Sequence, residues 1–169
     1  MGLELMDPEP SPRTRSEITR NIGELDQLID EILLASRLDA HETDIGTVEA
    51  VDLTGLAAEE SARADAALDL GDAPQTLVVQ GVAKLLRRAI RNLLENARRY
   101  SDGPVLVTVT REDGQAVLKV CDRGPGVPAA ERERIFEPFY RLPGASEREG
   151  GVGLGLALVR SISERHHGT

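Results

Sequence analysis

The sequence predicts an α+β fold, a two-layer α/β sandwich with helices on one face of a sheet, preceded by a long amphipathic helix. Three observations predict it. Apolar residues recur every three or four positions between residues 18 and 32. Two segments of alternating polarity flank an Asp-Gly pair at Asp113 and Gly114. Helical periodicity returns over Lys84 to Tyr100 and again near residue 160. Together these patterns place helices against an antiparallel hairpin.

Length and composition bound the class of protein. A chain of 169 residues holds one domain, or one domain with a small appendage. Its net charge of −9 argues against binding nucleic acid through a basic surface. The single cysteine, Cys121, excludes a disulfide framework and favours a reducing compartment. No apolar run is long enough to cross a membrane, so any anchor is expected outside this chain.

The first helix follows a proline-rich stretch, Asp7 to Arg15, that reads as a stiff connector, with Ser16 as the expected N-cap. Its apolar residues have the 4-3-4-3 spacing of a coiled-coil seam: Ile18, Ile22, Leu25, Ile29 and Ile32. Leu28 and Leu33 widen this face, which favours a dimeric four-helix bundle. The alternative is an amphipathic helix packed on its own domain.

The remaining elements follow in order after a polar linker at residues 39–46. Residues 51–68 begin as a short strand and become a helix, and short strands are expected at 67–70 and 76–80. A long helix covers Lys84 to Tyr100, with Leu86 and Ile90 on its apolar face. Residues 105–112 and 116–122 form the hairpin, because Asp-Gly favours a two-residue turn. A last helix covers residues 155–166.

The long helix carries a polar stripe. Asn92 and Asn96 are four residues apart, so their amides lie on one face, and Arg99 shares it. Amide oxygens can bind a metal ion, and guanidinium N–H groups can bind phosphate. A solvated helix face is the alternative. Glu95 is expected about a quarter of a turn off this face, in an ion pair with Arg91 or Arg99.

Two segments are rich in glycine: one comes directly after a predicted strand, and the other comes after a predicted loop. In "DRGPGV", Asp122 ends a strand, and its carboxylate can accept a hydrogen bond from an adenine amino group and reject guanine. A plain turn is the alternative. In the stretch 134–153, more than ten residues without periodicity follow Phe136 and Phe139; they hold Arg141 and Arg148 and are followed by the glycine cluster that opens the last helix. Such a loop above a glycine-rich helix start suits a triphosphate.

Taken together, these segments resemble the ATP-binding catalytic domain of sensor histidine kinases, within the superfamily of the gyrase, Hsp90 and MutL ATPases. "NLLENARRY" is similar to the N box, "DRGPG" to the G1 box, "FEPFYR" to the F box and "GVGLGL" to the G2 box. The resemblance covers about residues 50–169 and implies a Bergerat-type fold. It divides the chain into a partial dimerisation hairpin with its linker, 1–45, and a catalytic domain, 46–169.

The resemblance also implies roles for residues around ATP and Mg²⁺. Asn96 corresponds to the magnesium ligand, Arg99 to the residue that reaches the phosphates, and Asp122 to the carboxylate that holds adenine. Tyr100 corresponds to the aromatic residue that packs on the nucleotide. The other positions that it places around the nucleotide are Asn92, Gly124, Gly126, Arg141, Arg148, Gly151, Gly153 and Gly155.

The resemblance implies a protein-histidine kinase that transfers the γ-phosphoryl group of ATP to a histidine and on to the aspartate of a response regulator receiver domain. It implies a homodimer formed through the helical hairpin, and a cytoplasmic location, including the cytoplasmic part of an inner-membrane sensor. The hydrolytic branch carries a glutamate where this chain has Asn92, and an amide cannot take a proton from water.

The chain departs from the family's pattern in three respects, and two alternative functions are left open. None of His41, His166 and His167 lies in an acceptor motif, so this chain alone is not expected to autophosphorylate. The family's last two strands are expected to be missing, and Val82 leaves the long helix without a side-chain N-cap. One alternative is a non-catalytic dimerisation or nucleotide-binding fragment. The other is a serine kinase or ATPase of the same superfamily.

Overall fold

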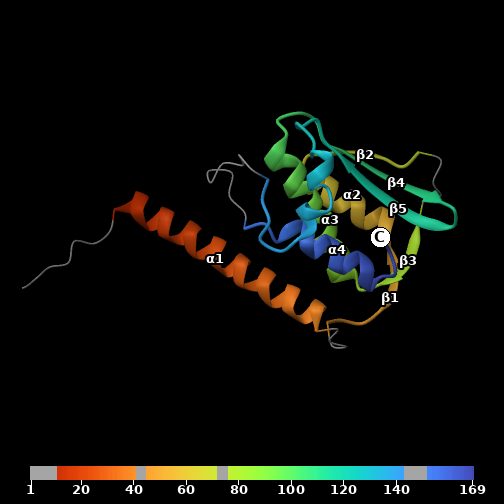
Figure 1. Ribbon diagram of the computed structural model, residues 1–169, viewed down its shortest axis with the longest axis horizontal. Coiled ribbons are helices and arrows are strands. Elements are labelled where there is room, and N and C mark those ends of the chain that lie inside the picture. The colour runs from red at the N-terminus through yellow and green to blue at the C-terminus, as the bar shows by residue number, and fades with distance from the viewer. Residues whose placement is uncertain (1–10, 41–44, 72–75, 143–151) are drawn as a thin grey trace, which may run out of the picture.

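The structure is a computed structural model that describes residues 11–40, 45–71, 76–142 and 152–169 (Figure 1). It has the predicted mixture of helices and sheets, with the long helix at its N-terminal end. The elements are α1 Pro12–Asp39, β1 Glu49–Asp52, α2 Leu53–Arg63, β2 Ala67–Asp69, β3 Val78–Gly81, α3 Ala83–Tyr100, β4 Leu106–Glu112, β5 Gln115–Cys121, η1 Ala129–Glu131, η2 Arg134–Phe136 and α4 Gly155–Arg165.

The strands form two small sheets. β1 pairs antiparallel with β3, and the other sheet has the order β2-β4-β5. β4 and β5 pair antiparallel from Leu106 opposite Cys121 to Glu112 opposite Gln115, which confirms the predicted Asp-Gly hairpin. β2 joins β4 in parallel. Figure 1 shows α2, α3 and α4 on one side of the three-stranded sheet, with α1 beyond them.

The start of α1 differs from the prediction. The helix begins at Pro12, and the hydroxyl of Ser11 accepts a hydrogen bond from the Thr14 N–H at 3.2 Å. Proline suits the first helical turn because its missing N–H would have no partner there. The residues at 12–15 therefore belong to the helix, and Ser16 lies inside it and is not its cap.

The two sides of α1 have different surroundings. Near the C-terminal end, Leu38 packs with Val82, Leu158 and Ile162 in a small core between α1, α3 and α4. Glu31, only 8% exposed, accepts a hydrogen bond from Arg88 at 2.6 Å. The predicted seam remains exposed on the other side, at Ile18, Ile22, Leu25, Ile29, Ile32 and Leu33. Packing on the chain's own domain therefore accounts for one side of α1 and not for the seam.

The main core lies between the sheets and helices α2 and α3. Its most buried members include Ala57 on α2, Leu94 on α3, and Val107 and Val109 on β4. Val107 and Val109 alternate with more exposed residues, as expected for a strand with one face on the core. This packing fixes the position of α3, which carries four of the twelve candidate site residues.

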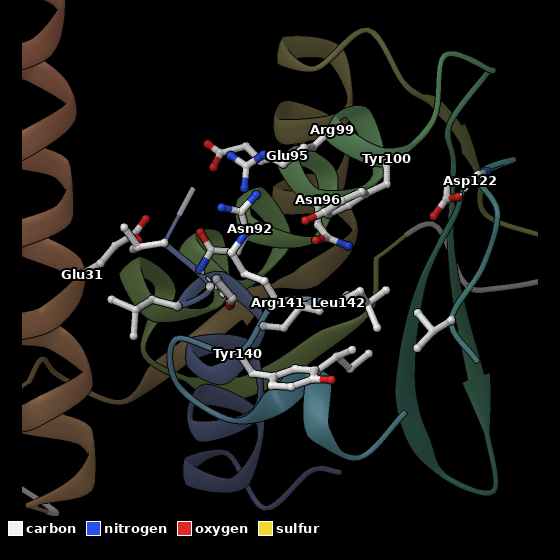
Figure 2. A pocket seen from close by; sticks show the side chains of 18 of the residues that line it. Glu31, Asn92, Glu95, Asn96, Arg99, Tyr100, Asp122, Tyr140, Arg141 and Leu142 are labelled. Carbon is white, nitrogen blue, oxygen red and sulfur yellow. Dashed lines mark hydrogen bonds between the residues drawn. The ribbon is translucent and has the colours of Figure 1, made fainter. Parts of the chain in front are cut away.

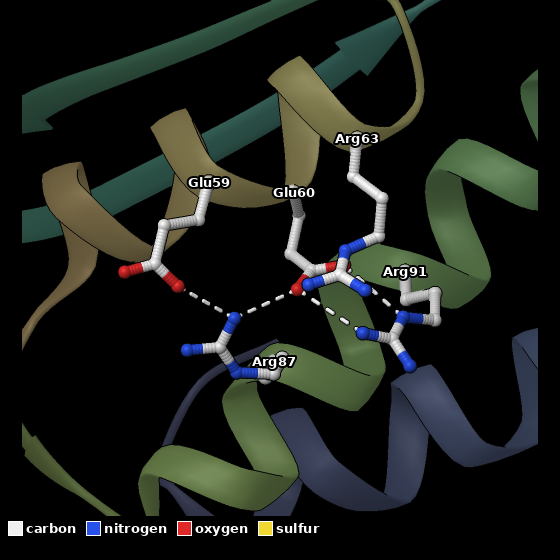
Figure 3. A network of polar contacts seen from close by, with 5 residues as sticks. All are labelled: Glu59, Glu60, Arg63, Arg87 and Arg91. Carbon is white, nitrogen blue, oxygen red and sulfur yellow. Dashed lines mark hydrogen bonds and ion pairs between the residues drawn. The ribbon is translucent and has the colours of Figure 1, made fainter.

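A buried carboxylate links α2 to α3. Glu60, 1% exposed, accepts hydrogen bonds from Arg87 at 2.8 Å and from Arg91 at 3.0 and 3.2 Å (Figure 3). Arg63 lies 3.8 Å from the same carboxylate. Burial alone would raise the pKa of Glu60, but the hydrogen bonds from Arg91 and Arg87 outweigh it and lower that pKa below 4.5.

The N-terminus of α3 has the predicted lack of a side-chain cap at Val82. Instead, the Val82 N–H donates to His166 Nε2 at 3.0 Å, and His166 Nδ1 lies 2.7 Å from the Ile162 carbonyl oxygen. Because Nε2 accepts, Nδ1 carries the proton and donates. A Cβ atom at Gly81 would lie 2.7 Å from His166 Cδ2 and 2.9 Å from Leu86 Cδ1. Gly81 therefore leaves room for the imidazole to join α4 to α3.

We expect Gly81→Ala to lower the free energy of unfolding by about 1–3 kcal/mol, because the added methyl group overpacks this contact. Urea unfolding followed by circular dichroism measures the change. Gly114→Ala is not a suitable control, because Gly114 has a φ of 83° and alanine would be strained in that conformation. Gly23→Ala is the control: a Cβ atom there meets nothing within 4 Å, and inside α1 the alanine should raise the free energy of unfolding by up to about 1 kcal/mol. Equal stability of Gly81→Ala and the wild type would contradict the proposed role of Gly81.

Candidate nucleotide site

Ten of the twelve candidate residues line one cavity of about 390 Å³ (Figure 2). α3 forms one wall, the turn after β5 forms one end, and the start of α4 closes another side. The ten are Asn92, Asn96, Arg99, Tyr100, Asp122, Gly124, Gly126, Arg141, Gly153 and Gly155. Arg148 and Gly151 lie outside the described residues. The structure thus brings together segments that are up to 63 residues apart, as between Asn92 and Gly155.

The polar stripe of α3 faces the cavity. Asn92 is 4% exposed, and its Nδ2 donates to the Gly155 carbonyl oxygen at 3.1 Å. This bond ties the first residue of α4 to α3, so Asn92 positions the glycine-rich helix start. Asn96 also lines the cavity, and its amide forms no hydrogen bond with the described residues. The Asn96 amide is therefore available to a ligand.

Within the described residues, Glu95 forms neither of the two predicted ion pairs, with Arg91 or with Arg99. Glu95 lines the same cavity as Asn92 and Asn96, because residues three apart on a helix are neighbours, as are residues four apart. Arg91 pairs with Glu60 in place of Glu95. Figure 2 shows Glu95 and Arg99 at the same end of the cavity. The cavity lining therefore includes a carboxylate and a guanidinium from the same helix.

Asp122 lies at the opposite end of the cavity from Glu31 (Figure 2). Its Oδ1 accepts a hydrogen bond from the Gly124 N–H at 2.6 Å. Its Oδ2 has no hydrogen-bond partner among the described residues. A Cβ atom at Gly124 would lie 2.5 Å from the Tyr100 carbonyl oxygen, so only glycine allows this close approach. The turn thus holds one carboxylate oxygen and presents the other.

The two segments that flank residues 143–151 are joined at the edge of the cavity. The Phe139 N–H donates to the Gly153 carbonyl oxygen at 3.0 Å. Gly153 has a φ of 81°, and a Cβ atom there would lie 2.7 Å from the Tyr140 carbonyl oxygen. Phe139 itself has a φ of 64°, which is unusual for an aromatic residue. Backbone in such conformations often marks a functional site.

Tyr140 supplies an aromatic wall that the sequence analysis did not single out. Its hydroxyl donates to Glu131, and the Arg134 guanidinium lies 4.3 Å from its ring centre. The hydrogen bond to Glu131 raises the pKa of Tyr140, because it stabilises the protonated phenol. The ring is thereby held against the cavity.

Helix α1 contributes two further residues that the sequence analysis did not assign to the site. Leu28 and Glu31 line the cavity, and Figure 2 shows Glu31 on the side opposite Asp122. Leu28 was noticed only as widening the apolar face of the first helix. No periodicity within α1 could reveal its contact with α3 and α4. One wall of the cavity therefore comes from α1, which lies outside the part of the sequence that carries the four motifs.

The described residues contain no group of three or more His, Cys, Asp or Glu side chains that could hold a metal ion by themselves. Mg²⁺ usually keeps several waters and binds through one or two protein oxygens plus substrate phosphates. The available amide of Asn96 fits that mode of binding. The donor set therefore suits a metal ion that arrives with a phosphate ligand.

A cavity lined by a carboxylate with an unpaired oxygen at one end, and by amides and guanidiniums along α3 and the following segments, has the features of a nucleotide site. Residues 81–169, more than half of the chain, match the family of histidine kinase-, DNA gyrase B- and HSP90-like ATPases. The chain belongs to this family. Within it, the chain is an ATPase domain of the sensor histidine kinase type, as its relatives show.

Two relatives illustrate this. The chain is 34% identical over 178 residues to the sensor protein kinase PmrB of Pseudomonas aeruginosa, covering 100% of this chain and 36% of PmrB. It is 35% identical to the probable sensor histidine kinase TcrY of Mycobacterium tuberculosis, covering 96% of this chain and 36% of TcrY. The chain thus spans about a third of the length of these curated relatives.

Solved structures agree with the fold. The mycobacterial sensor histidine kinase MprB aligns with a TM-score of 0.58 and 30% identity, over 72% of this chain and 81% of that one. Full-length ShkA in complex with AMPPNP aligns with a TM-score of 0.68 and 28% identity, over 91% of this chain and 34% of ShkA. The described residues contain no helix of the length and apolarity needed to cross a membrane.

Proposed function

We propose that this chain binds Mg-ATP in the cavity along α3 and presents the γ-phosphoryl group to a histidine outside the chain. The phosphoryl group then passes to the aspartate of a response regulator receiver domain. The observation that carries this proposal is the arrangement of Asp122, Asn96 and Arg99 around one cavity. The relative ShkA, solved with an ATP analogue, supports the ligand class.

Each residue has a role that follows from its chemistry. Asp122 Oδ2 accepts a hydrogen bond from the adenine amino group, while Oδ1 stays on the Gly124 N–H. Asn96 and Arg99 line the same cavity from α3, and their amide oxygen and guanidinium suit metal and phosphate. Mg²⁺ bound with the phosphates neutralises charge that develops during phosphoryl transfer. Arg141, Gly153 and Gly155 line the same cavity and are assigned to the phosphates.

Asn92 favours transfer over hydrolysis. Its amide is buried and donates to Gly155, so it cannot serve as the base that activates a water molecule. This observation argues against the water-activating ATPase alternative. A serine kinase remains less well supported, because the long helix with an exposed apolar seam is what a dimeric histidine kinase requires.

Dimerisation, partner and location belong to the same proposal. The exposed seam of α1 pairs with a second copy in a four-helix bundle completed by residues beyond this chain. None of His41, His166 and His167 lies in an acceptor motif, and His166 is occupied between Val82 and Ile162. The acceptor histidine is therefore expected elsewhere in the full protein. We place the chain in the cytoplasm, where ATP is available.

We expect Asn96→Ala to remove most of the magnesium dependence of AMPPNP binding. The wild-type chain should bind AMPPNP at least ten times more tightly with Mg²⁺ than without it, and the variant should show less than a threefold difference. Isothermal titration calorimetry measures both values.

Gln115→Ala, on the exposed end of β5 away from the cavity, serves as the control and should behave like the wild type. Binding of AMPPNP that is equally strong with and without Mg²⁺ in the wild-type chain would refute the assigned metal role. Absence of binding by the folded chain would favour the alternative of a dimerisation fragment.

A further inference from the structure

A second cavity, of about 650 Å³, lies between the end of α2 and the C-terminal half of α3. Its charged lining consists of four arginines, Arg63, Arg91, Arg98 and Arg99, against two glutamates, Glu60 and Glu95. We call it the arginine cavity. The chain as a whole has a net charge of −9, so a concave site with an excess of arginine runs against its general charge.

The carboxylate of Glu60, which lines this cavity, already has hydrogen-bond partners within the chain. That carboxylate is held by Arg87 and Arg91, and Glu60 is 1% exposed. Figure 3 shows Arg63 from α2 and Arg91 from α3 converging on that carboxylate. The charge of Glu60 therefore fixes the arginines in place, and their remaining N–H groups stay available.

Hydrogen bonds hold Arg91 and Arg98 in position but use only some of their N–H donors. Arg91 uses Nε and Nη2 for Glu60, and Arg98 uses Nε and Nη2 for the Ala64 and Asp65 carbonyl oxygens. The Nη1 groups of Arg91 and Arg98 have no partner in the part of the chain that the structure describes. Arg63 forms no hydrogen bond there and reaches Glu60 only at 3.8 Å. These N–H groups are therefore available to an anionic ligand.

We propose that the arginine cavity is a second anion site, which takes a compact phosphate or polyphosphate group. Guanidinium groups bind phosphate oxygens through paired N–H donors, and preordered arginines lose little entropy on binding. A concave site with convergent guanidiniums suits a compact anion better than an extended acidic peptide. The proposal does not depend on the nucleotide site, although Glu95 and Arg99 line both cavities.

The test is a titration of the ¹⁵N-labelled chain with tripolyphosphate, without metal ions and at constant ionic strength. Amide signals of Ala64 and Asp65 report on the arginine cavity, and those of Gly124 and Gly153 report on the nucleotide cavity. We expect saturable shifts at Ala64 and Asp65. The Arg63→Ala variant should weaken that binding at least fivefold, and Arg111→Ala, at an exposed position near the end of β4, should not.

The Arg63→Ala variant should fold normally, because the side chain is 67% exposed and forms no hydrogen bond in the described chain. Shifts confined to Gly124 and Gly153 would overturn the proposal and leave the nucleotide site intact. Shifts at Ala64 that Arg63→Ala does not change would also overturn it. Tighter saturable binding of a hexaglutamate peptide than of tripolyphosphate would assign the cavity to an acidic protein segment instead.

Discussion

The Asp122→Asn variant is expected to bind ADP about 100-fold more weakly than the wild type, a loss of about 2.7 kcal/mol. The substitution keeps an oxygen for the Gly124 N–H, so the turn after β5 is preserved. It replaces Oδ2, which has no partner in the described chain, with an amide nitrogen. Two N–H donors then face each other when adenine binds, and each loses a hydrogen bond. Equilibrium dialysis with ADP measures the change.

The neighbouring Arg123→Gln serves as the matched control, because it changes the charge beside the turn and leaves the carboxylate in place. Arg123 is exposed and does not line the cavity. We expect its affinity for ADP to stay within a factor of two or three of the wild type. If Asp122→Asn binds ADP as tightly as Arg123→Gln, the assignment of adenine to Asp122 is wrong.

Removing the buried carboxylate of Glu60 should have the largest effect on stability. We expect Glu60→Ala to lower the free energy of unfolding by about 3 kcal/mol, because Arg87 and Arg91 lose their common partner. This value is at the low end for a buried ion pair, since both arginines are about a third exposed. Chemical unfolding of the wild type and the variant measures it.

Glu59→Ala is the matched control on the adjacent residue. Glu59 also pairs with Arg87, at 2.7 Å, but its side chain is 61% exposed. Exposed ion pairs contribute little, so we expect a loss below about 1 kcal/mol. Similar losses in the two variants would show that the burial of Glu60 does not set its contribution.

The same carboxylate makes stability depend on pH. The pKa of Glu60 is lower in the folded chain than its ordinary value of 4.5, so the unfolded state binds more protons near that pH. Its stabilisation is present above pH 4.5 and is lost as pH falls through the lower folded pKa. Glu112 behaves in the same direction because of Lys119, so the wild type must be compared with Glu60→Gln. We expect the wild type to lose its advantage over Glu60→Gln on acidification below pH 4.5. A constant difference would contradict this.

Much of the fold could be predicted because local patterns decide it. The Asp-Gly turn set the register of β4 and β5, and helical periodicity located α3 and α4 to within about two residues. The start of α1 was predicted too late, because a proline-rich stretch indicates a stiff connector, whereas Pro12 occupies the first turn of the helix. Propensity alone does not distinguish those two roles of proline.

The candidate site was predictable where its residues lie in contiguous motifs. The stripe of Asn92, Asn96 and Arg99 follows from spacing on one helix, and the structure places all three in the cavity. Contacts between distant segments were not predictable. Glu31 reaches the cavity only because α1 packs on α3 and α4, and Glu60 finds its arginines 27 and 31 residues away. Such pairings depend on tertiary packing and leave no local periodic signal.

The central claim is that this chain holds an adenine nucleotide, and calorimetric titration with Mg-AMPPNP and Mg-GMPPNP tests it most directly. The account predicts saturable binding of the adenine analogue with one site per chain, and at least tenfold weaker binding of the guanine analogue. The carboxylate of Asp122 accepts from the adenine amino group and repels the guanine carbonyl oxygen at the same position. Equal binding of both analogues, or no binding by a chain that circular dichroism shows to be folded, would contradict it.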